Sequence, residues 1–254
     1  MESPEARRLA GQVGIVTGAS SGLGKATAAA LAQAGADVVL LARSKADLEH
    51  VADRVEVAGR RALPLPVDLA REDHILSAVE QSLARFGRID ALVNAAGTDV
   101  PGPVVDLPVE AWDRVLGVNL RAPFLLARAV FPHMRQAGRG TIVNISSVAG
   151  KRGWANAAAY CASKFGLAGL TQALAAEGKP HGIRACIVYP GGMATNWGVW
   201  SPGERSASPR QAPRPTQSLP PDRVAALVVW ILTAPPEVVL NEAIVTPLEE
   251  TGWP

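Results

Sequence analysis

Short apolar segments alternate along this chain with longer segments whose apolar residues recur at helical spacing. The short segments, such as GQVGIVTG and DVVLLA, are apolar on both faces and rich in Val, Ile and Leu. Strands of this kind, separated by helix-length connections, are typical of a parallel sheet covered by helices on both faces. The pattern therefore predicts an α/β protein with a doubly wound sheet of about seven strands. Strands are expected at residues 11–18, 37–42, 61–68, 89–97, 140–146, 183–190 and 241–247, and helices at 25–36, 45–58 and 72–86.

One segment breaks this alternation. Residues 196–221 contain six prolines and no periodic apolar pattern. A linker to a second domain is one interpretation, but only about 33 residues follow it, too few for a domain. Long irregular loops inside one domain are usually lids or disordered segments. We therefore expect a single domain over residues 1–254, with 196–221 as a substrate lid in which Trp197 and Trp200 offer apolar contacts.

Composition and charge exclude several classes of protein. The chain is 48% hydrophobic and 19% charged, which argues against disorder. Its net charge is only +2 and its basic residues form no cluster, so the sequence shows no basic region of the kind that binds nucleic acid. The N-terminus lacks the order of a signal peptide, and apolar runs such as 224–234 are about half the length that spans a bilayer. Cys161 and Cys186 have no redox or metal spacing and the histidines are scattered, so we expect a reduced, cytoplasmic protein without a metal site.

A glycine-rich segment, TGASSGLGKA, follows the first expected strand and opens the first helix. Its glycines are Gly18, Gly22 and Gly24, in the spacing T-G-x-x-x-G-x-G. Tight turns and close approach of a ligand to the backbone need residues without a Cβ, and a helix N-terminus presents free N–H groups to phosphate. The order of strand, glycine turn and helix predicts a dinucleotide-binding site.

This spacing, with YCASK at 160–164 downstream, resembles the short-chain dehydrogenase/reductase family. Four further segments fit the family in order: NAAG at 94–97, Asn119 in GVNL, the serine pair 146–147 of NISS, and PGGMAT at 190–195. The resemblance covers residues 9–195 and extends more loosely to 247. It implies a Rossmann-type fold, NAD(P)-dependent oxidoreductase activity, and homodimers or homotetramers joined through the helices near 105–135 and 155–178.

The end of the second strand bears on the choice of cofactor. An acidic residue there usually binds the ribose 2′-hydroxyl of NAD, but this chain has Ala42, followed by Arg43 and Ser44. A carboxylate would repel a 2′-phosphate, whereas Arg offers it a charged planar fork. Asp37 lies at the start of the strand, too early to replace the missing acid. NADP(H) is therefore the expected cofactor, and NAD(H) with a solvent-facing Arg43 is the alternative.

The resemblance implies further cofactor contacts. Asp68 and Leu69 match the family's adenine-contacting residues, although Asp68 could instead cap the helix that begins near Glu72. The NAAG turn would line the adenosine, and PGGMAT would bracket the nicotinamide. Besides the glycines and Arg43, the implied residues are Ser20, Ser21, Leu23, Ser44, Asp68, Leu69, Asn94, Ala95, Gly97, Tyr160, Lys164, Pro190, Gly191, Met193 and Thr195.

Tyr160 and Lys164 are four residues apart, which places them one turn apart on the same face of a helix. Taken alone, this spacing is more typical of a solvated surface helix. Hydride transfer to a carbonyl, however, builds charge on the oxygen, and a proton must arrive there. A phenol has a pKa near 10, and a cation within one turn would stabilise the phenolate and lower that pKa. Tyr160 is therefore the expected general acid/base.

Two more groups complete the expected catalytic set. The family's serine lies thirteen residues before the tyrosine, which selects Ser147 over Ser146. Its hydroxyl would hold the substrate oxygen as charge develops, and Asn119 would hold a water linked to Lys164. Singly, Ser147 could form a local turn and Asn119 could be an ordinary polar residue in a helix, but their order in the family favours the catalytic roles. Cys161 is turned about 100° from Tyr160 on the helix and is expected to pack.

The expected reaction is carbonyl reduction, or alcohol oxidation in reverse, on a small molecule. Trp154 and Trp197 join Ser147 and Tyr160 as expected substrate contacts, which favours an apolar or aromatic carbonyl compound without identifying it. Two alternatives stay open. One is an NAD-linked alcohol dehydrogenase of the same fold. The other is a non-catalytic nucleotide-binding scaffold, which would be expected to have lost Ser147, Tyr160 or Lys164.

Overall fold

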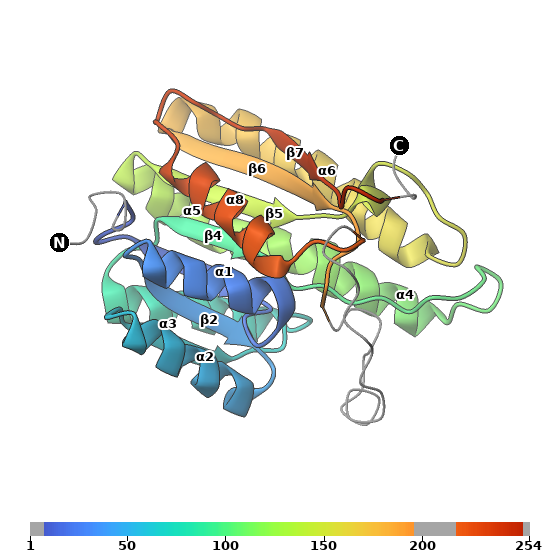
Figure 1. Cartoon of the computed structure of the whole chain (residues 1–254), viewed down its shortest axis with the longest axis horizontal. Helices are drawn as coiled ribbons and strands as arrows, with labels where there is room; N and C mark the ends of the chain where they lie inside the picture. Colours follow the sequence, from blue (N-terminus) through green and yellow to red (C-terminus); the bar gives the residue numbers. More distant parts are fainter. Residues whose placement is uncertain (1–7, 196–216, 251–254) are drawn as a thin grey trace.

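The computed structural model describes residues 8–195 and 217–250, whose strands form one parallel seven-stranded sheet (Figure 1). The strand order is β3-β2-β1-β4-β5-β6-β7, so the winding reverses between β1 and β4. In open sheets of this type, ligands bind at the carboxyl ends of the strands beside such a reversal. The predicted doubly wound sheet is confirmed. Its strands are β1 (Val13–Thr17), β2 (Asp37–Ala42), β3 (Ala62–Pro66), β4 (Ala91–Asn94), β5 (Gly140–Ile145), β6 (Ile183–Pro190) and β7 (Glu242–Val245).

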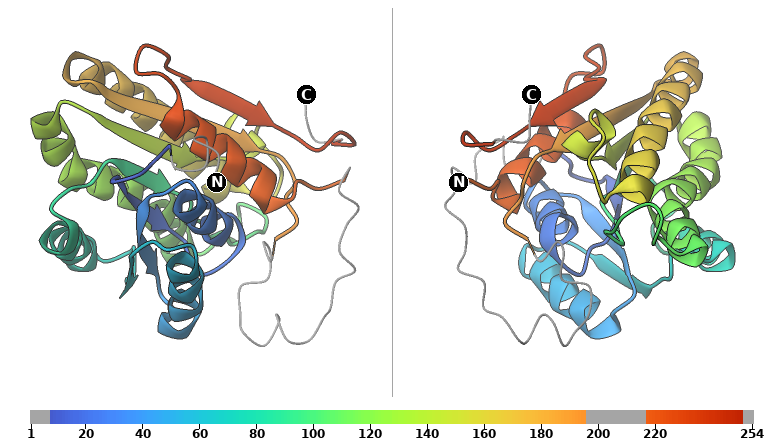
Figure 2. Two further views of the ribbon diagram at one scale, coloured as in Figure 1. Left: turned by 60° about the vertical axis from the view of Figure 1, so that its left-hand side comes forward. Right: turned by 90° about the vertical axis from the view of Figure 1, so that its right-hand side faces the viewer.

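Helices cover both faces of the sheet (Figure 2). Successive residues of a strand point to opposite faces, so Val38 of β2 belongs to one core and Val39 to the other. The first core lies under α1 (Gly22–Gln33), α2 (Lys45–Val57) and α8 (Pro221–Thr233). The second lies under α3 (Glu72–Phe86), α5 (Ala122–Ala137) and α6 (Ala158–Gly178). The remaining short elements are α4 (Val109–Leu116), η2 (Gly117–Arg121), η3 (Val148–Gly150) and η4 (Lys179–His181).

The elements follow the apolar pattern closely, with differences where glycines turn the chain. The strand expected at 89–97 ends at Asn94, and the helix expected at 25–36 begins at Gly22 because Ser21 is already its N-cap. That helix ends at Gln33, and Gly35, with a φ of +99°, turns the chain into β2. The apolar run 224–234 lies largely in α8, whose inner side packs against α1.

The elements α4, η2 and α5 form one continuous helical run, Val109–Ala137. By length and composition alone this run could cross a membrane, with a mean hydropathy of 1.3 in its most apolar window. Its buried residues, such as Leu125, Leu126 and Met134, belong to the core beneath the sheet. The run is therefore a core helix of this fold.

Candidate active site

Loops that follow four neighbouring strands meet at one edge of the sheet. The glycine turn follows β1, the NAAG turn ends β4, Ser147 follows β5, and the PGGMAT turn begins at the end of β6. Because these strands are parallel, their carboxyl ends share an edge. The turns after β1 and β6 approach each other, since a Cβ built on Gly22 would lie 3.4 Å from the methyl group of Thr195. The fold thus brings the predicted cofactor and catalytic segments together.

The glycine turn requires residues without a Cβ, for reasons of backbone conformation or of space. Gly18 and Gly22 have φ values of +68° and +52°, which residues with a Cβ rarely adopt. A Cβ on Gly24 would overlap the Gly18 carbonyl. Ser21 caps α1 without a side-chain hydrogen bond, and the first turn of α1 carries no acidic residue. The free N–H groups at this helix start fit an anionic pyrophosphate.

Thr17 ties the glycine turn to the NAAG turn. Its Oγ1 accepts hydrogen bonds from the backbone N–H groups of Ala95 and Ala96, each at 3.0 Å. A lone threonine at the end of a strand gives no signal of this role in the sequence. Asn94, by contrast, is buried and donates from Nδ2 to Oδ1 of Asn144 at 2.8 Å. Its side chain lies within the sheet, so any cofactor contact of Asn94 is left to its backbone.

The end of β2 presents a basic and not an acidic residue. Arg43 and Ser44 are exposed, and Ser44 caps α2 by accepting from the Asp47 N–H at 3.3 Å. The backbone N–H of Ala19 donates to the Leu41 carbonyl at 3.2 Å, which holds the glycine turn beside this strand end. Arg43 is therefore placed next to the dinucleotide turn.

Asp37 lies at the opposite end of β2, where its carboxylate already pairs with two arginines. Its carboxylate accepts from Arg60 Nη2 at 2.8 Å and from Arg61 Nε at 2.8 Å. Burial would raise the pKa of Asp37, but the hydrogen bonds from Arg61 and Arg60 hold it below its usual value. Asp37 joins β2 to the start of β3 and lies at the end of β2 away from the glycine turn.

Asp68 and Leu69 follow β3. Asp68 is half-buried, and its Oδ1 accepts from the Ala70 N–H at 3.0 Å in an Asx turn. The alternative role for Asp68, as the cap of the next helix, is wrong, because Arg71 occupies the N-cap of α3. Leu69 is buried beside it.

Asn119 lies in a single π-helical turn, η2, that interrupts an otherwise α-helical run. Such turns are often found at functional sites, and no spacing or motif in the sequence indicates this one. The buried amide of Asn119 accepts from the Thr98 N–H and donates to the Thr98 carbonyl, both at 2.9 Å. It also donates to Ser163 Oγ at 3.1 Å. Asn119 therefore connects the loop after β4 to α6 by hydrogen bonds.

Ser147, Tyr160 and Lys164 form one group beneath this loop. The Tyr160 hydroxyl is hydrogen-bonded to the Ser147 side chain, whose Oγ also accepts from the Ala149 N–H at 3.2 Å. The Lys164 side chain donates to the Ile145 carbonyl at 2.9 Å, and its Nζ lies 5.6 Å from the Tyr160 ring centroid. Lys164 is only 3% exposed, so the surface-helix interpretation of YCASK is wrong.

The neighbouring serine has a different place. Ser146 Oγ donates to the Lys164 carbonyl at 3.2 Å and is buried between β5 and α6. Ser147, and not Ser146, faces Tyr160, in agreement with the choice made from spacing. Cys161 is buried beside Ala149, as expected of a packing residue.

The electrostatics of this group differ from the expectation in one respect. Burial raises the pKa of the Tyr160 phenol well above its usual value, and the Ser147 hydrogen bond offsets this only in part. The charges of Asp99 and Cys161 also raise the pKa of Tyr160. Burial lowers the pKa of Lys164 to about 8. The protein's own groups therefore keep Tyr160 as a neutral phenol, and do not produce the lowered pKa expected from the Tyr–Lys spacing.

The expected substrate contacts are only partly described. Trp154 is half-exposed on the loop before α6, and its backbone N–H donates to Cys161 Sγ at 3.4 Å. Trp197, Trp200 and residues 196–216 of the expected lid lie outside the described residues. The end of that segment is tied to the turn after β6, because the Leu219 N–H donates to the Gly192 carbonyl at 2.8 Å.

The sheet, the glycine turn at its point of reversal and the Ser–Tyr–Lys group define a Rossmann-type oxidoreductase. Residues 12–200 match the family model described as short chain dehydrogenase, and the chain belongs to that family.

Relatives and solved structures agree with this assignment. A D-threitol dehydrogenase of Mycolicibacterium smegmatis is 36% identical over 228 residues, which cover 88% of this chain and 86% of the relative. The structure of a metagenomic short-chain oxidoreductase in complex with NADP has a TM-score of 0.82 at 38% identity, covering 96% of this chain and 100% of the other. Carveol dehydrogenase from Mycobacterium avium, in complex with NAD, has a TM-score of 0.85 at 27% identity, with 95% and 98% covered. Both nicotinamide cofactors therefore occur among similar proteins.

Proposed function

We propose that this protein transfers a hydride between NADP(H) and a carbonyl or alcohol substrate, with Tyr160 as general acid/base. The observation that carries the proposal is the grouping of half-buried Ser147 with buried Tyr160 and Lys164 at the edge where the glycine turn opens α1. A bound nicotinamide would supply or accept the hydride. A non-catalytic scaffold would have no use for a desolvated lysine held against a tyrosine.

The protonation states favour a defined sequence of proton movements. At neutral pH the raised pKa of Tyr160 leaves its phenol protonated, and the lowered pKa of Lys164, about 8, leaves most of its amine protonated. In reduction, the Tyr160 O–H gives its proton to the substrate oxygen, and the nearby Lys164 ammonium stabilises the phenolate that remains. Ser147 holds the same oxygen by a hydrogen bond.

The phenolate must then regain a proton, and the structure suggests how. The Asn119 side chain already makes three hydrogen bonds, to the backbone of Thr98 and to Ser163 Oγ. We propose that the Asn119 main-chain carbonyl in the π-helical turn holds the expected water linked to Lys164. The side chain fixes the position of this turn.

The function is tested by a screen with purified protein. We expect ketones or aldehydes to be reduced with loss of NADPH absorbance in a panel of carbonyl compounds and alcohols, offered with both nicotinamides. Saturable cofactor binding without turnover of any compound would favour the scaffold alternative. The names of similar proteins include a threitol and a carveol dehydrogenase, so the panel should span polar and apolar alcohols.

Arg43 is proposed as the residue that selects NADP(H). Replacing it with Ala is expected to raise KM for NADPH by about 10- to 100-fold, because a hydrogen bond to a charged group contributes about 1.5–3 kcal/mol. KM for NADH should change little. Arg54→Ala, at an exposed arginine further along α2, is the matched control. Equal changes for the two cofactors, measured by initial rates, would contradict the role.

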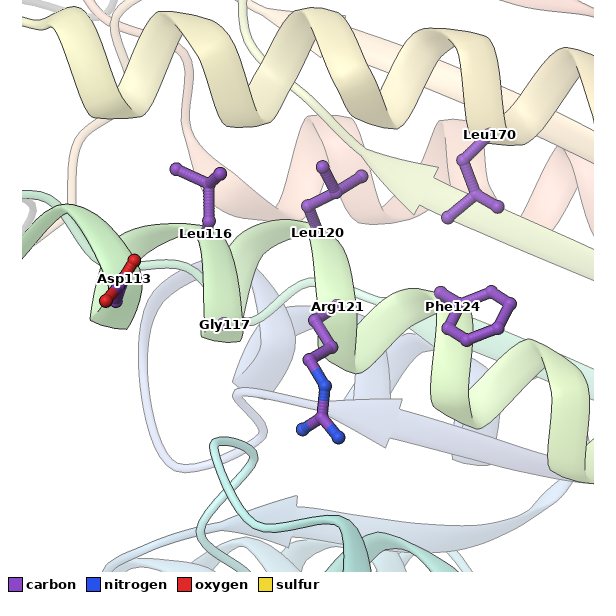
Figure 3. A pocket seen from close by; sticks show the side chains of 7 residues that line it. All are labelled: Asp113, Leu116, Gly117, Leu120, Arg121, Phe124 and Leu170. Carbon is purple, nitrogen blue, oxygen red and sulfur yellow. The ribbon is translucent and has the colours of Figure 1, made fainter.

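The chain is also proposed to form homo-oligomers through one apolar face. A groove of about 620 Å³ lies between the α4–α5 run and α6 (Figure 3). In it, Phe124 is 46% exposed although its neighbours on α5 are buried. A second copy of the chain would cover this apolar groove and remove the Phe124 ring from water. The groove is lined by Asp113, Leu116, Gly117, Leu120, Arg121, Phe124 and Leu170.

Phe124→Arg is expected to reduce the assembly to a smaller species in light scattering, because a charge would be buried in the contact. Val57→Arg is the control, since Val57 is exposed on α2, remote from the groove. An unchanged mass for Phe124→Arg would exclude this face as the interface.

Both cysteines in the described residues are free and buried, which agrees with the proposed cytoplasmic location.

A further inference from the structure

A buried carboxylate lies next to the catalytic group and takes no part in the proton movements described above. Asp99, in the loop after β4, is only 9% exposed. Its Oδ1 accepts from the N–H of the next residue, Val100, at 2.8 Å. Within the part of the chain that the structure describes, no cationic side chain pairs with it. Asn119 links this loop to the helix that carries Tyr160, because its amide binds Thr98, next to Asp99, and Ser163 Oγ on α6.

The loop that carries Asp99 is held in place on both sides. The Asn119 amide binds both backbone groups of Thr98, immediately before Asp99. Three residues after Asp99, the Gly102 N–H donates to the Asn156 carbonyl at 2.9 Å. Asn156 belongs to the segment that leads into Tyr160 and has a φ of +61°, which Asn tolerates better than most residues. Asp99 is therefore fixed relative to the tyrosine.

A carboxylate in this position is costly unless something pairs with it. An unpaired charge removed from water is disfavoured, and burial accordingly raises the pKa of Asp99, with the Val100 hydrogen bond opposing the shift only in part. Nothing in the described fold needs a carboxylate here, because the Val100 N–H would be satisfied equally well by Asn. The group that would justify an acid beside Tyr160 is a hydrogen-bond donor on a bound ligand.

We propose that Asp99 is a substrate-binding residue that accepts a hydrogen bond from a hydroxyl or ammonium group close to the reacting carbon. The substrate class is then the hydroxy- or amino-substituted carbonyl compounds and the matching alcohols, which is more polar than the apolar class favoured by the tryptophans. This proposal rests on the proposed function. It adds to that function a defined second contact on the substrate.

The proposal is tested first on the unaltered protein. Three ketones that differ only in the group on the carbon next to the carbonyl are compared: aminoacetone, hydroxyacetone and butanone, or the same series built on the best compound of the screen. We expect kcat/KM for the amino or the hydroxy ketone to exceed that for the methyl analogue by about 10- to 100-fold, as for a hydrogen bond to a charged group. Equal values for the three would overturn the proposal.

Two variants then test whether a preference for a donor-bearing ketone depends on Asp99, and whether the donor is an ammonium or a hydroxyl group. Asp99→Asn keeps an acceptor but removes the charge, so it should abolish an ammonium preference and largely keep a hydroxyl preference. Asp99→Ala should abolish both preferences, so that kcat/KM for the three ketones becomes equal within a few-fold. Asp106→Asn, on an exposed acid further along the same loop, should change neither. A donor preference that persists in Asp99→Ala would overturn the assignment.

The outcomes keep the two proposals apart. Reduction of carbonyl compounds without any donor preference would leave the oxidoreductase intact and remove Asp99 from the binding site. Failure to reduce any compound of a broad panel, with NADPH bound, would overturn both. If the Asp99 variants do not fold, the comparison of the three ketones on the unaltered protein still decides the question.

Discussion

Replacing Tyr160 with Phe is expected to lower kcat by about 10²- to 10⁴-fold, the usual contribution of a positioned general acid or base. The change removes only the hydroxyl group that is hydrogen-bonded to Ser147, and the aromatic ring stays buried. KM for NADPH should remain within a few-fold, because the glycine turn and Arg43 are untouched. Steady-state rates with a substrate from the screen, together with cofactor titration, measure both quantities.

The other tyrosine of the chain provides a matched control. Tyr189 is fully buried near the end of β6, and its ring lies 4.6 Å from Lys151 Nζ. Tyr189→Phe removes a hydroxyl from a similar buried setting outside the catalytic group, so kcat should stay within a few-fold. If Tyr160→Phe keeps most of its activity on every substrate, Tyr160 is not the acid/base and the proposed mechanism is wrong.

Replacing Lys164 with Met should change activity and stability in opposite directions. The ammonium that would stabilise the phenolate is lost, so kcat should fall by at least about 10²-fold. A desolvated charge is also removed. One pH unit of pKa corresponds to about 1.4 kcal/mol, so a Lys164 pKa of about 8, below the usual 10.5, indicates a destabilisation on the order of 3 kcal/mol at neutral pH. Loss of the hydrogen bond from Lys164 to the Ile145 carbonyl offsets part of this gain in stability. We therefore expect the free energy of unfolding of Lys164→Met to exceed that of the unaltered protein by about 1–3 kcal/mol.

The pH dependence of that difference has a definite sign. Between about pH 8 and 10.5 the unfolded chain keeps a proton on Lys164 that the folded protein has released. Stability conferred at this site therefore rises with pH across this window. The advantage of Lys164→Met over the unaltered protein should be largest below pH 8 and shrink above it, as measured by denaturant unfolding at several pH values. An advantage that grows with pH would contradict a desolvated ammonium at this position.

The fold was predictable from the sequence because its determinants are local. Apolar segments such as 37–42 and 183–190 form buried strands, and the glycine spacing needs only backbone geometry to specify a turn. The choice of Ser147 over Ser146 came from the family resemblance, in which the serine lies thirteen residues before the tyrosine, and the structure places Ser147 against Tyr160.

What the sequence did not reveal depends on contacts between distant segments. The clamp of Asn119 on Thr98 requires a π-helical turn that no spacing rule indicates. The pKa of Tyr160 is raised mainly by burial, and only the Ser147 hydrogen bond lowers it. Asp99 is a single acid in a loop, and only the folded structure shows that it is buried in the loop that Asn119 links to α6. These features arise from packing, so pattern and propensity could not predict them.

The most direct test of the proposed reaction is to follow the hydride itself. NADPH carrying deuterium at both positions of C4 is incubated with a ketone from the screen, and the alcohol is examined by mass spectrometry and NMR. The proposed function predicts one deuterium on the new carbinol carbon with the unaltered protein, and almost no labelled product with Tyr160→Phe. An alcohol without deuterium, or labelled alcohol formed equally fast by Tyr160→Phe, would contradict it.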